Sequence, residues 1–284
     1  MVARTQPIEQ CHKPSDGLSL FYTDLDRSAV EVREIEKMGN RIAERMFVSF
    51  GSFFAWKKLI LTYTPDSIAH FKAYPHIYDL YEKFRKFNKA NNGGDLNRLI
   101  SIVLNVEKVL DEDNVQGALA EVGVYKGNTA CLLAYYAREY ERKCFLFDTY
   151  EGFDKRDLEG IDEKFKKGEF RDTTLESVKS VIGSEALDTC EFLTGYFPES
   201  IPDYLDKEKF AVVSLDCDLY KPMKAGLTWF YPRMQNGAIF LLHDYSSRYW
   251  EGAKKAIDEF CSETKQQVIL LPDKSGSAFI RIHR

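Results

Sequence analysis

The sequence predicts an α/β fold built on a doubly wound, mostly parallel sheet. From residue 118 onward, short apolar runs alternate with helical segments, as strand-helix-strand units do. The last two runs, 268–271 and 278–282, are joined instead by Pro-Asp-Lys-Ser-Gly, which predicts an antiparallel β-hairpin. With 284 residues, 44% of them hydrophobic, the chain is long enough for one large α/β domain and a helical extension.

The N-terminal third carries a helical pattern without recognisable chemistry. Apolar residues recur at helical spacing over 32–46 and 77–84, and the sequence Asn-Asn-Gly-Gly at 91–94 interrupts the pattern. We therefore divide the chain into two parts. The helical segment 1–94 is expected to form a lid or to contact the substrate or another subunit, and the α/β domain covers 95–284.

Each element of the α/β domain has a local signal. Asp95 can cap a helix that runs to Leu110. Thr173 and Glu176 have the spacing of a capping box, which would start a helix through Ile182. The other strands are expected at 118–124, 143–149, 191–194, 211–216 and 238–243, and the other helices at 128–140, 250–262 and between the last two of these strands.

Composition and charge exclude several classes of function. A net charge of -5 argues against a nucleic-acid partner bound through phosphate neutralisation. The six cysteines form no close pair, which favours reduced thiols in a cytoplasmic protein. The richest apolar run, 46–56, is too short to span a bilayer, so we expect no transmembrane segment and interpret the run as a buried helix or a homo-oligomer contact.

Two acidic clusters follow two of the predicted strands. Asp216 and Asp218 end one apolar run, and His243 and Asp244 end the next. Ligands of open α/β sheets bind outside the carboxyl ends of the strands, so we expect the two clusters to lie together. Carboxylates and an imidazole gathered in one place can hold a divalent cation.

A glycine-containing turn follows the first strand. Gly123 and Gly127 allow a tight turn and close approach of a ligand, and the helix that begins near Asn128 points free N–H groups at an anion. Asp148 ends the next strand, where a carboxylate can accept both hydroxyls of a ribose. The pair indicates an adenosine-type ligand. The dinucleotide fingerprint is absent, however, and a purely structural turn is an equal alternative.

Several motifs of the domain occur together in a known family. They are Glu121-Val-Gly-Val-Tyr-Lys-Gly127, Phe147-Asp-Thr-Tyr-Glu-Gly-Phe153, Leu215-Asp-Cys-Asp-Leu-Tyr220, Tyr231-Pro232, Gly237, and His243-Asp-Tyr245 followed by Ala253-Lys-Lys-Ala-Ile-Asp-Glu-Phe260. Over about 95–282 the chain resembles the macrocin O-methyltransferase (TylF-like) family, S-adenosylmethionine-dependent enzymes that methylate sugar hydroxyls in bacterial natural products. The resemblance implies a seven-stranded sheet of class I methyltransferase type, S-adenosylmethionine as cofactor, a divalent cation, and a small-molecule acceptor with a sugar hydroxyl.

The resemblance also implies roles for the matching residues. In the cofactor site, the methionine end would be held by Glu121, Gly123 and the turn from Gly127 to Thr129, the ribose by Asp148 with Thr149 beside it, and the adenine by Tyr196 or Phe197. In the metal site, the family's magnesium ligands correspond to Asp216, His243 and Asp244, and the family's candidate base corresponds to Asp218.

His243 is a departure from the family pattern, which has aspartate there. Imidazole is a softer ligand than carboxylate and would shift the preference from magnesium toward manganese, iron or zinc. His243 could instead be the catalytic base, because imidazole accepts a proton near neutrality. The third reading is that His243 only bonds a backbone carbonyl.

The segment from Tyr150 to Asp172 is long for a connection and rich in charge. Loops of this length are often lids, and we expect this one to close over the substrate and select the acceptor. The alternative is a solvated surface loop.

Two other functions remain open from the sequence. The pattern Asp216-x-Asp218 is also the metal motif of many nucleotide-sugar glycosyltransferases, although the turn at Gly123 and the terminal hairpin favour a methyltransferase. A non-catalytic binding protein is the other alternative, with His243 as a sign of lost activity.

Overall fold

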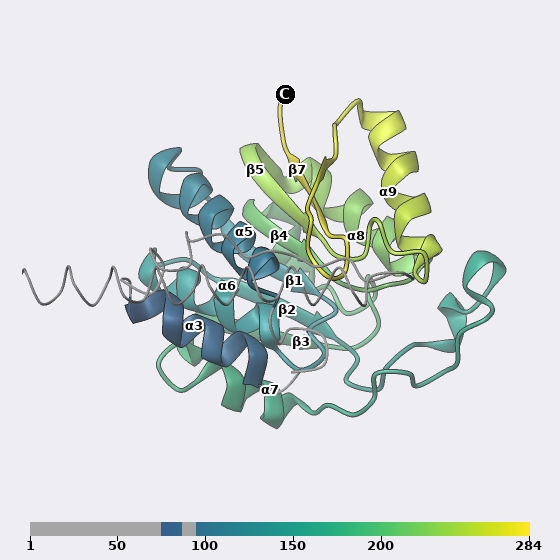
Figure 1. The fold of residues 1–284 in the computed structure, drawn as a ribbon, viewed down its shortest axis with the longest axis horizontal. Helices are drawn as coiled ribbons and strands as arrows, with labels where there is room; N and C mark the ends of the chain where they lie inside the picture. The colour runs from purple at the N-terminus through teal and green to yellow at the C-terminus, as the bar shows by residue number, and fades with distance from the viewer. Residues whose placement is uncertain (1–74, 87–94) are drawn as a thin grey trace, which may run out of the picture. The chain divides into compact units, whose positions relative to one another are not determined.

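The protein contains a seven-stranded sheet with the order β3-β2-β1-β4-β5-β7-β6 (Figure 1). The computed structural model describes residues 75–86 and 95–284. The first five strands pair in parallel, whereas β7 is antiparallel to both β5 and β6. This confirms the predicted doubly wound sheet with its terminal hairpin. The strands are β1 (Ala118–Val122), β2 (Cys144–Asp148), β3 (Cys190–Thr194), β4 (Phe210–Leu215), β5 (Met234–Leu242), β6 (Ile269–Leu270) and β7 (Ala278–Arg281).

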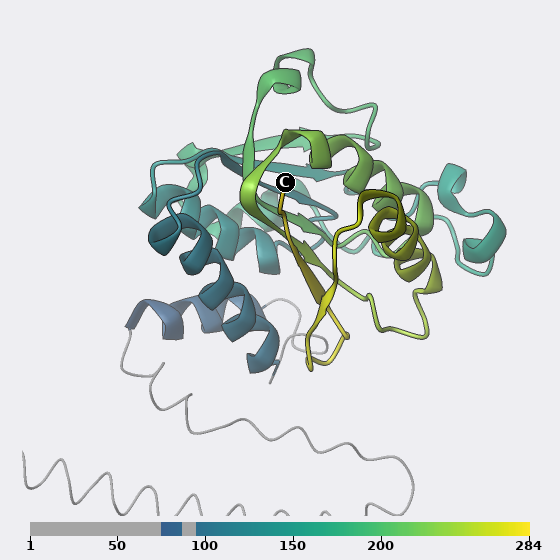
Figure 2. The same ribbon diagram turned by 90° about the horizontal axis from the view of Figure 1, so that it is seen from above.

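Helices cover both faces of this sheet. Figures 1 and 2 show α5 and α6 on one face and α8 and α9 on the other. The α-helices of the described residues are α3 (Pro75–Lys86), α5 (Leu96–Glu107), α6 (Asn128–Glu139), α7 (Leu175–Ile182), α8 (Tyr220–Phe230) and α9 (Glu251–Thr264). None of the helices in these ranges is long and apolar enough to cross a membrane.

The central strands are buried on both faces, which is why they are unbroken apolar runs in the sequence. All five residues of β1 and all six of β4 are buried. Glu121 and Ser214 are polar exceptions within these strands, and the parallel register places them side by side. The strand register therefore sets a carboxylate and a hydroxyl together just below the end of the sheet.

Helix α5 begins as predicted. The side chain of Asp95 accepts a hydrogen bond from the backbone N–H of Arg98, as an N-cap does. The predicted helix around 77–84 is also present as α3, which contacts α6 through the Asn128 amide, a donor to the carbonyl of Phe84 at 2.6 Å. The predicted helical stretch 32–46 and the apolar run 46–56 lie outside the described residues.

Three local predictions need correction. The capping box of α7 is formed by Thr174 and Ser177 rather than by Thr173 and Glu176. The hydroxyl of Thr173 instead donates to the carbonyl of Tyr125. Strand β5 begins at residue 234 instead of 238, and the first arm of the hairpin has only two strand residues.

The described cysteines are free thiols, in agreement with the predicted absence of a disulfide framework among them. They are Cys131, Cys144, Cys190, Cys217 and Cys261.

Candidate active site

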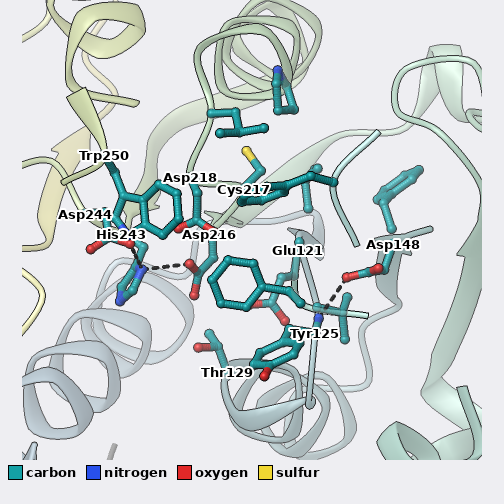
Figure 3. A pocket seen from close by; sticks show the side chains of 18 of the residues that line it. Glu121, Tyr125, Thr129, Asp148, Asp216, Cys217, Asp218, His243, Asp244 and Trp250 are labelled. Carbon is teal, nitrogen blue, oxygen red and sulfur yellow. Dashed lines mark hydrogen bonds and ion pairs between the residues drawn. The ribbon is translucent and has the colours of Figure 1, made fainter. Parts of the chain in front are cut away.

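A cavity of about 750 Å³ lies at the carboxyl ends of the strands. Segments that follow β1, β2, β3, β4 and β5 all contribute to its wall. This is the crevice in which open α/β sheets bind ligands. Figure 3 shows that the two parts predicted from the sequence, the turn after β1 and the acidic clusters after β4 and β5, face the same space.

The turn after β1 depends on Gly123. Its φ is +87°, and a Cβ atom at this position would lie 2.1 Å from the carbonyl oxygen of Asp216. The N–H of Gly123 donates to the carbonyl of Phe147 at 3.0 Å. The chain therefore passes between β2 and β4 at a point where there is no room for a side chain.

Replacing Gly123 with alanine should destabilise the fold by about 2–4 kcal/mol, because backbone strain and a steric clash add together. Gly160→Ala is the matched control, since Gly160 also has positive φ (+60°) but has no atom within 4 Å of the added Cβ. Its loss should be about 1 kcal/mol, from backbone strain alone. Urea denaturation measures both. Equal losses would show that the close approach of Gly123 to Asp216 does not matter.

Asp148 connects the end of β2 to the turn. One carboxylate oxygen accepts the backbone N–H of Tyr125 at 2.8 Å, and the other accepts that of Tyr150 at 2.6 Å. Burial raises the pKa of Asp148, which these backbone hydrogen bonds oppose. Thr149 stabilises the next turn, where its hydroxyl donates to the carbonyl of Gly152. Both side chains line the cavity.

Glu121 is almost fully buried in β1 but lines the cavity. Its Oε1 accepts the hydroxyl of Ser214 at 3.3 Å, and its Oε2 has no hydrogen-bond partner among the described residues. Burial raises the pKa of Glu121 well above its usual value, and nearby Asp216 adds to the effect. A buried carboxylate with an unpaired oxygen is costly unless a ligand satisfies it.

Tyr196 lies in the cavity wall after β3. Its hydroxyl donates to Asp157 at 2.6 Å, and the guanidinium of Arg156 lies over its ring at 3.6 Å. The aromatic face of Tyr196 is therefore shared with a cation from the segment 150–172. Phe197, the other residue expected near an adenine, also lines the cavity.

The two acidic clusters form one group. Donor atoms of Asp216, Asp218, His243 and Asp244 all lie within 4.8 Å of one another. The Nδ1 atom of His243 lies 2.7 Å from an oxygen of Asp216 and 2.7 Å from an oxygen of Asp244 (Figure 3). Neither imidazole nitrogen has a hydrogen bond of acceptable alignment within the described ranges. The third reading of His243, a bond to a backbone carbonyl, is therefore wrong.

The close charges of Asp216, Asp218, His243 and Asp244 shift the pKa values of several of these side chains. Burial and the guanidinium of Arg98 would lower the pKa of His243, but Asp216 and Asp244 together raise it to about 10. Burial would raise the pKa of Asp216, but His243 and Arg98 hold it below its usual value. Burial raises the pKa of Asp218 well above its usual value, and Asp244 and Asp216 contribute in the same direction.

Asp218 and Asp244 share an unusual backbone conformation. Their φ angles are +58° and +59°. Aspartate and asparagine tolerate this left-handed region better than alanine does. Two such residues in one site are consistent with backbone strain that positions functional groups.

Arg98 is a site residue that sequence reasoning missed. Its Nη2 atom donates to Asp216 at 2.9 Å and to the hydroxyl of Thr129 at 3.0 Å, although Arg98 comes from α5. Arg98 is 6% exposed. The signal was present in the sequence, because Arg98 shares the buried face of α5 with Ile102 and Val106. A cation within an apolar stripe needs a buried partner.

The segment 150–172 is packed against the rest of the site. Phe153, Phe165 and Phe170 all contact the ring of Trp250, with centroid distances of 4.5–5.9 Å. Asp162 is 1% exposed, and its carboxylate accepts the backbone N–H of Tyr220 at 2.7 Å, the first residue of α8. The alternative of a solvated surface loop is therefore wrong for these residues. Trp250 and Asp162 were not predicted to have roles.

The sheet order, the reversed β7 and the cavity at the strand ends define the fold of class I methyltransferases. Solved structures that share it include two methyltransferases. The O-methyltransferase NovP matches with a TM-score of 0.57 and 24% identity over 66% of this chain and 80% of that one. The calicheamicin methyltransferase CalS11 matches with a TM-score of 0.54 and 21% identity over 73% and 93%, respectively. At these identities, the likeness concerns the fold.

The family is established by sequence. Residues 94–275 match the family model of macrocin-O-methyltransferase (TylF), and the chain belongs to this family. A tetracenomycin-C rhamnosyl 4'-O-methyltransferase of Streptomyces olivaceus is 29% identical over 53% of this chain and 61% of its own length. Mycinamicin III 3''-O-methyltransferase of Micromonospora griseorubida is 29% identical over 53% and 63%, respectively. The chain thus spans less than two thirds of the length of either relative.

Proposed function

We propose that the protein transfers a methyl group from S-adenosylmethionine to a hydroxyl of a sugar or of a glycosylated small molecule. The main support is the single cavity that unites the turn after β1, Asp148 and the acidic group after β4 and β5. Membership of the macrocin O-methyltransferase family gives independent support. The sugar acceptor is suggested by the relatives, whose names specify a rhamnosyl group and mycinamicin III.

On the cofactor side, each predicted residue has a physical task. Gly123 and Thr129 line the wall near the start of α6, and Glu121 presents an unpaired carboxylate oxygen to the cavity. Gly127 does not line the cavity; it is the N-cap of α6, where its positive φ lets the helix start. Asp148 keeps lone pairs for two ribose hydroxyls besides its two backbone hydrogen bonds. Thr149 fixes the turn beside Asp148, and Tyr196 offers a ring for the adenine.

On the acceptor side, Asp216, His243 and Asp244 fit a divalent cation. Two carboxylate oxygens converge on one imidazole nitrogen, so the three side chains lie close enough to share an ion once the imidazole has lost its proton. Magnesium is the family's metal, and the imidazole favours manganese or another transition metal. A bound cation would lower the pKa of the acceptor hydroxyl.

The proposed base is Asp218. Its raised pKa makes its carboxylate a stronger base than an exposed aspartate, and it lines the cavity among the candidate metal ligands. His243 is less suited, because its pKa of about 10 means that it already holds a proton near neutrality. S-adenosylmethionine supplies an activated methyl group. The remaining task of the protein is alignment of the acceptor oxygen, a term of up to about 7–11 kcal/mol.

Calorimetry with S-adenosylhomocysteine and with a nucleotide sugar such as UDP-glucose tests the proposal. We expect S-adenosylhomocysteine to bind and UDP-glucose not to bind. Asp148→Asn should weaken S-adenosylhomocysteine binding about tenfold, because hydrogen bonds to a charged carboxylate become bonds to a neutral amide. Asp206→Asn is the control, since Asp206 is an exposed partner of Arg233 that does not line the cavity.

The alternatives give different results. Binding of UDP-glucose alone would favour a glycosyltransferase, and binding of neither compound would favour a non-catalytic protein. Either outcome would contradict the proposal.

A further inference from the structure

Two buried residues of opposite charge type, Arg98 and Glu121, line the same cavity. Arg98 comes from α5 and Glu121 from β1, and both side chains are less than a tenth exposed. Charged groups are rarely buried without a partner, because desolvation is costly. What each side chain can bind therefore depends on which of its hydrogen-bonding atoms are left for a ligand.

The contacts of Arg98 leave part of its guanidinium available. Both hydrogen bonds of this group are made by Nη2, to Asp216 and Thr129. Nη1 and Nε make no hydrogen bond to the described residues. A guanidinium has five N–H donors, so three remain for a ligand in the cavity. The ring of Phe84 lies 5.7 Å from the guanidinium carbon and covers it from the α3 side.

Glu121 has the opposite need: one of its carboxylate oxygens lacks a hydrogen-bond donor within the described part of the chain. Only Oε1 has a partner, the hydroxyl of Ser214, and Oε2 is buried without one among the described residues. An ammonium group would satisfy this oxygen. A carboxylate would satisfy the free N–H donors of Arg98.

We propose that Arg98 binds the α-carboxylate of the amino-acid end of S-adenosylmethionine, opposite Glu121, which binds the α-ammonium group. The two residues together match a zwitterion: the cation of Arg98 would face the carboxylate, and the anion of Glu121 would face the ammonium group. This inference rests on the proposed function and adds a cofactor-binding residue from outside the matched motifs. Thr129 supports it as a positioning residue, because its hydroxyl accepts from Nη2 and holds the guanidinium beside the start of α6.

The same guanidinium contacts Asp216, so Arg98 connects the cofactor site to the acidic group. The contact fixes the guanidinium in place before the cofactor binds. Charge-assisted hydrogen bonds from a preorganised arginine are among the stronger polar contacts in proteins. The carboxylate should therefore contribute much of the affinity of the cofactor.

Two ligands separate this contact from the rest of the site. S-adenosylhomocysteine has the amino-acid end, whereas 5'-methylthioadenosine shares its adenosine and thioether but lacks the carboxylate and the ammonium. Titration calorimetry of the full chain, wild type and Arg98→Gln, is run with both. We expect Arg98→Gln to weaken S-adenosylhomocysteine about ten- to a hundredfold while 5'-methylthioadenosine affinity changes by less than about twofold.

Two further variants serve as checks. Asp206→Asn is the matched control, because Asp206 is an exposed partner of Arg233 that does not line the cavity, and its affinity for both ligands should stay within about twofold of wild type. Arg98→Lys keeps the charge without the planar fork and should show a selective loss of about fivefold or more. It decides the matter if Arg98→Gln does not fold.

The proposal is overturned if Arg98→Gln, or Arg98→Lys in its place, weakens both ligands equally or leaves S-adenosylhomocysteine unaffected. Wild-type protein that binds neither ligand would refute the proposed function, and the assignment of Arg98 with it. Wild-type binding of both ligands with equal affinity would refute the assignment of Arg98 alone.

Discussion

Asp244→Asn should lower the metal-stimulated rate of methyl transfer about a hundredfold or more, because the proposed cation would lose a charged oxygen ligand. Asp244 is buried, and one of its oxygens lies 2.7 Å from Nδ1 of His243. The affinity for S-adenosylhomocysteine should change by less than about threefold, since the proposal places Asp244 at the metal and acceptor and not at the cofactor. Initial rates across a magnesium and manganese titration, with calorimetry in parallel, measure both quantities.

Asparagine is chosen for a structural reason. Alanine at position 244 would combine the loss of the ligand with the strain of a φ of +59°, whereas asparagine tolerates that conformation. Asp258→Asn is the control, because Asp258 lies on α9, is paired with Lys254 and does not line the cavity. Full wild-type activity in excess chelator, or an unchanged rate in Asp244→Asn, would contradict the metal assignment.

His243→Asp should change both the metal preference and its dependence on pH. In the wild type, the pKa of His243 is raised to about 10, so a cation bound by His243 would have to displace its proton near neutrality. The imidazole is protonated below that pKa, and lower pH therefore weakens binding. The apparent affinity for manganese should rise by up to about tenfold per pH unit between pH 7 and pH 9.

In His243→Asp, the pH dependence of metal affinity should largely disappear, because a carboxylate is already ionised over this range. The metal preference should move toward magnesium, because a carboxylate is a harder ligand than imidazole. Calorimetry with each metal over this pH range measures both effects without an acceptor. His283→Gln is the control, since His283 lies near the C-terminus and does not line the cavity. A flat wild-type pH profile would exclude His243 as a ligand. An unchanged metal preference in His243→Asp would do the same.

The order of elements was predictable because each has a local signal. Strands such as β4 are buried along their whole length, so they stand out as unbroken apolar runs. Boundaries were predicted less well. The start of α7 was misplaced because Thr173 and Thr174 are both able to cap a helix, and the sequence does not distinguish between two adjacent threonines.

Some of the residues that line the candidate site could be predicted from the sequence, and others could not. Parallel strands end at one edge of the sheet, which is why Asp216 and His243 could be expected together from their positions after two strands. Arg98 could not be assigned to them, because its contact with Asp216 depends on how α5 packs against the sheet. The aromatic contacts of Trp250 with the segment 150–172 depend on tertiary packing in the same way.

By itself, the sequence determined the α/β class, because hydrophobic period is a local property, and its motifs indicated the family and the candidate site residues. Only the tertiary structure decided the partners of those residues. It paired Asp216 with Arg98, 118 positions away, and placed Asp218 and Asp244 in the left-handed conformation. Such contacts depend on how segments far apart in the sequence pack together, and no single stretch of sequence contains that information.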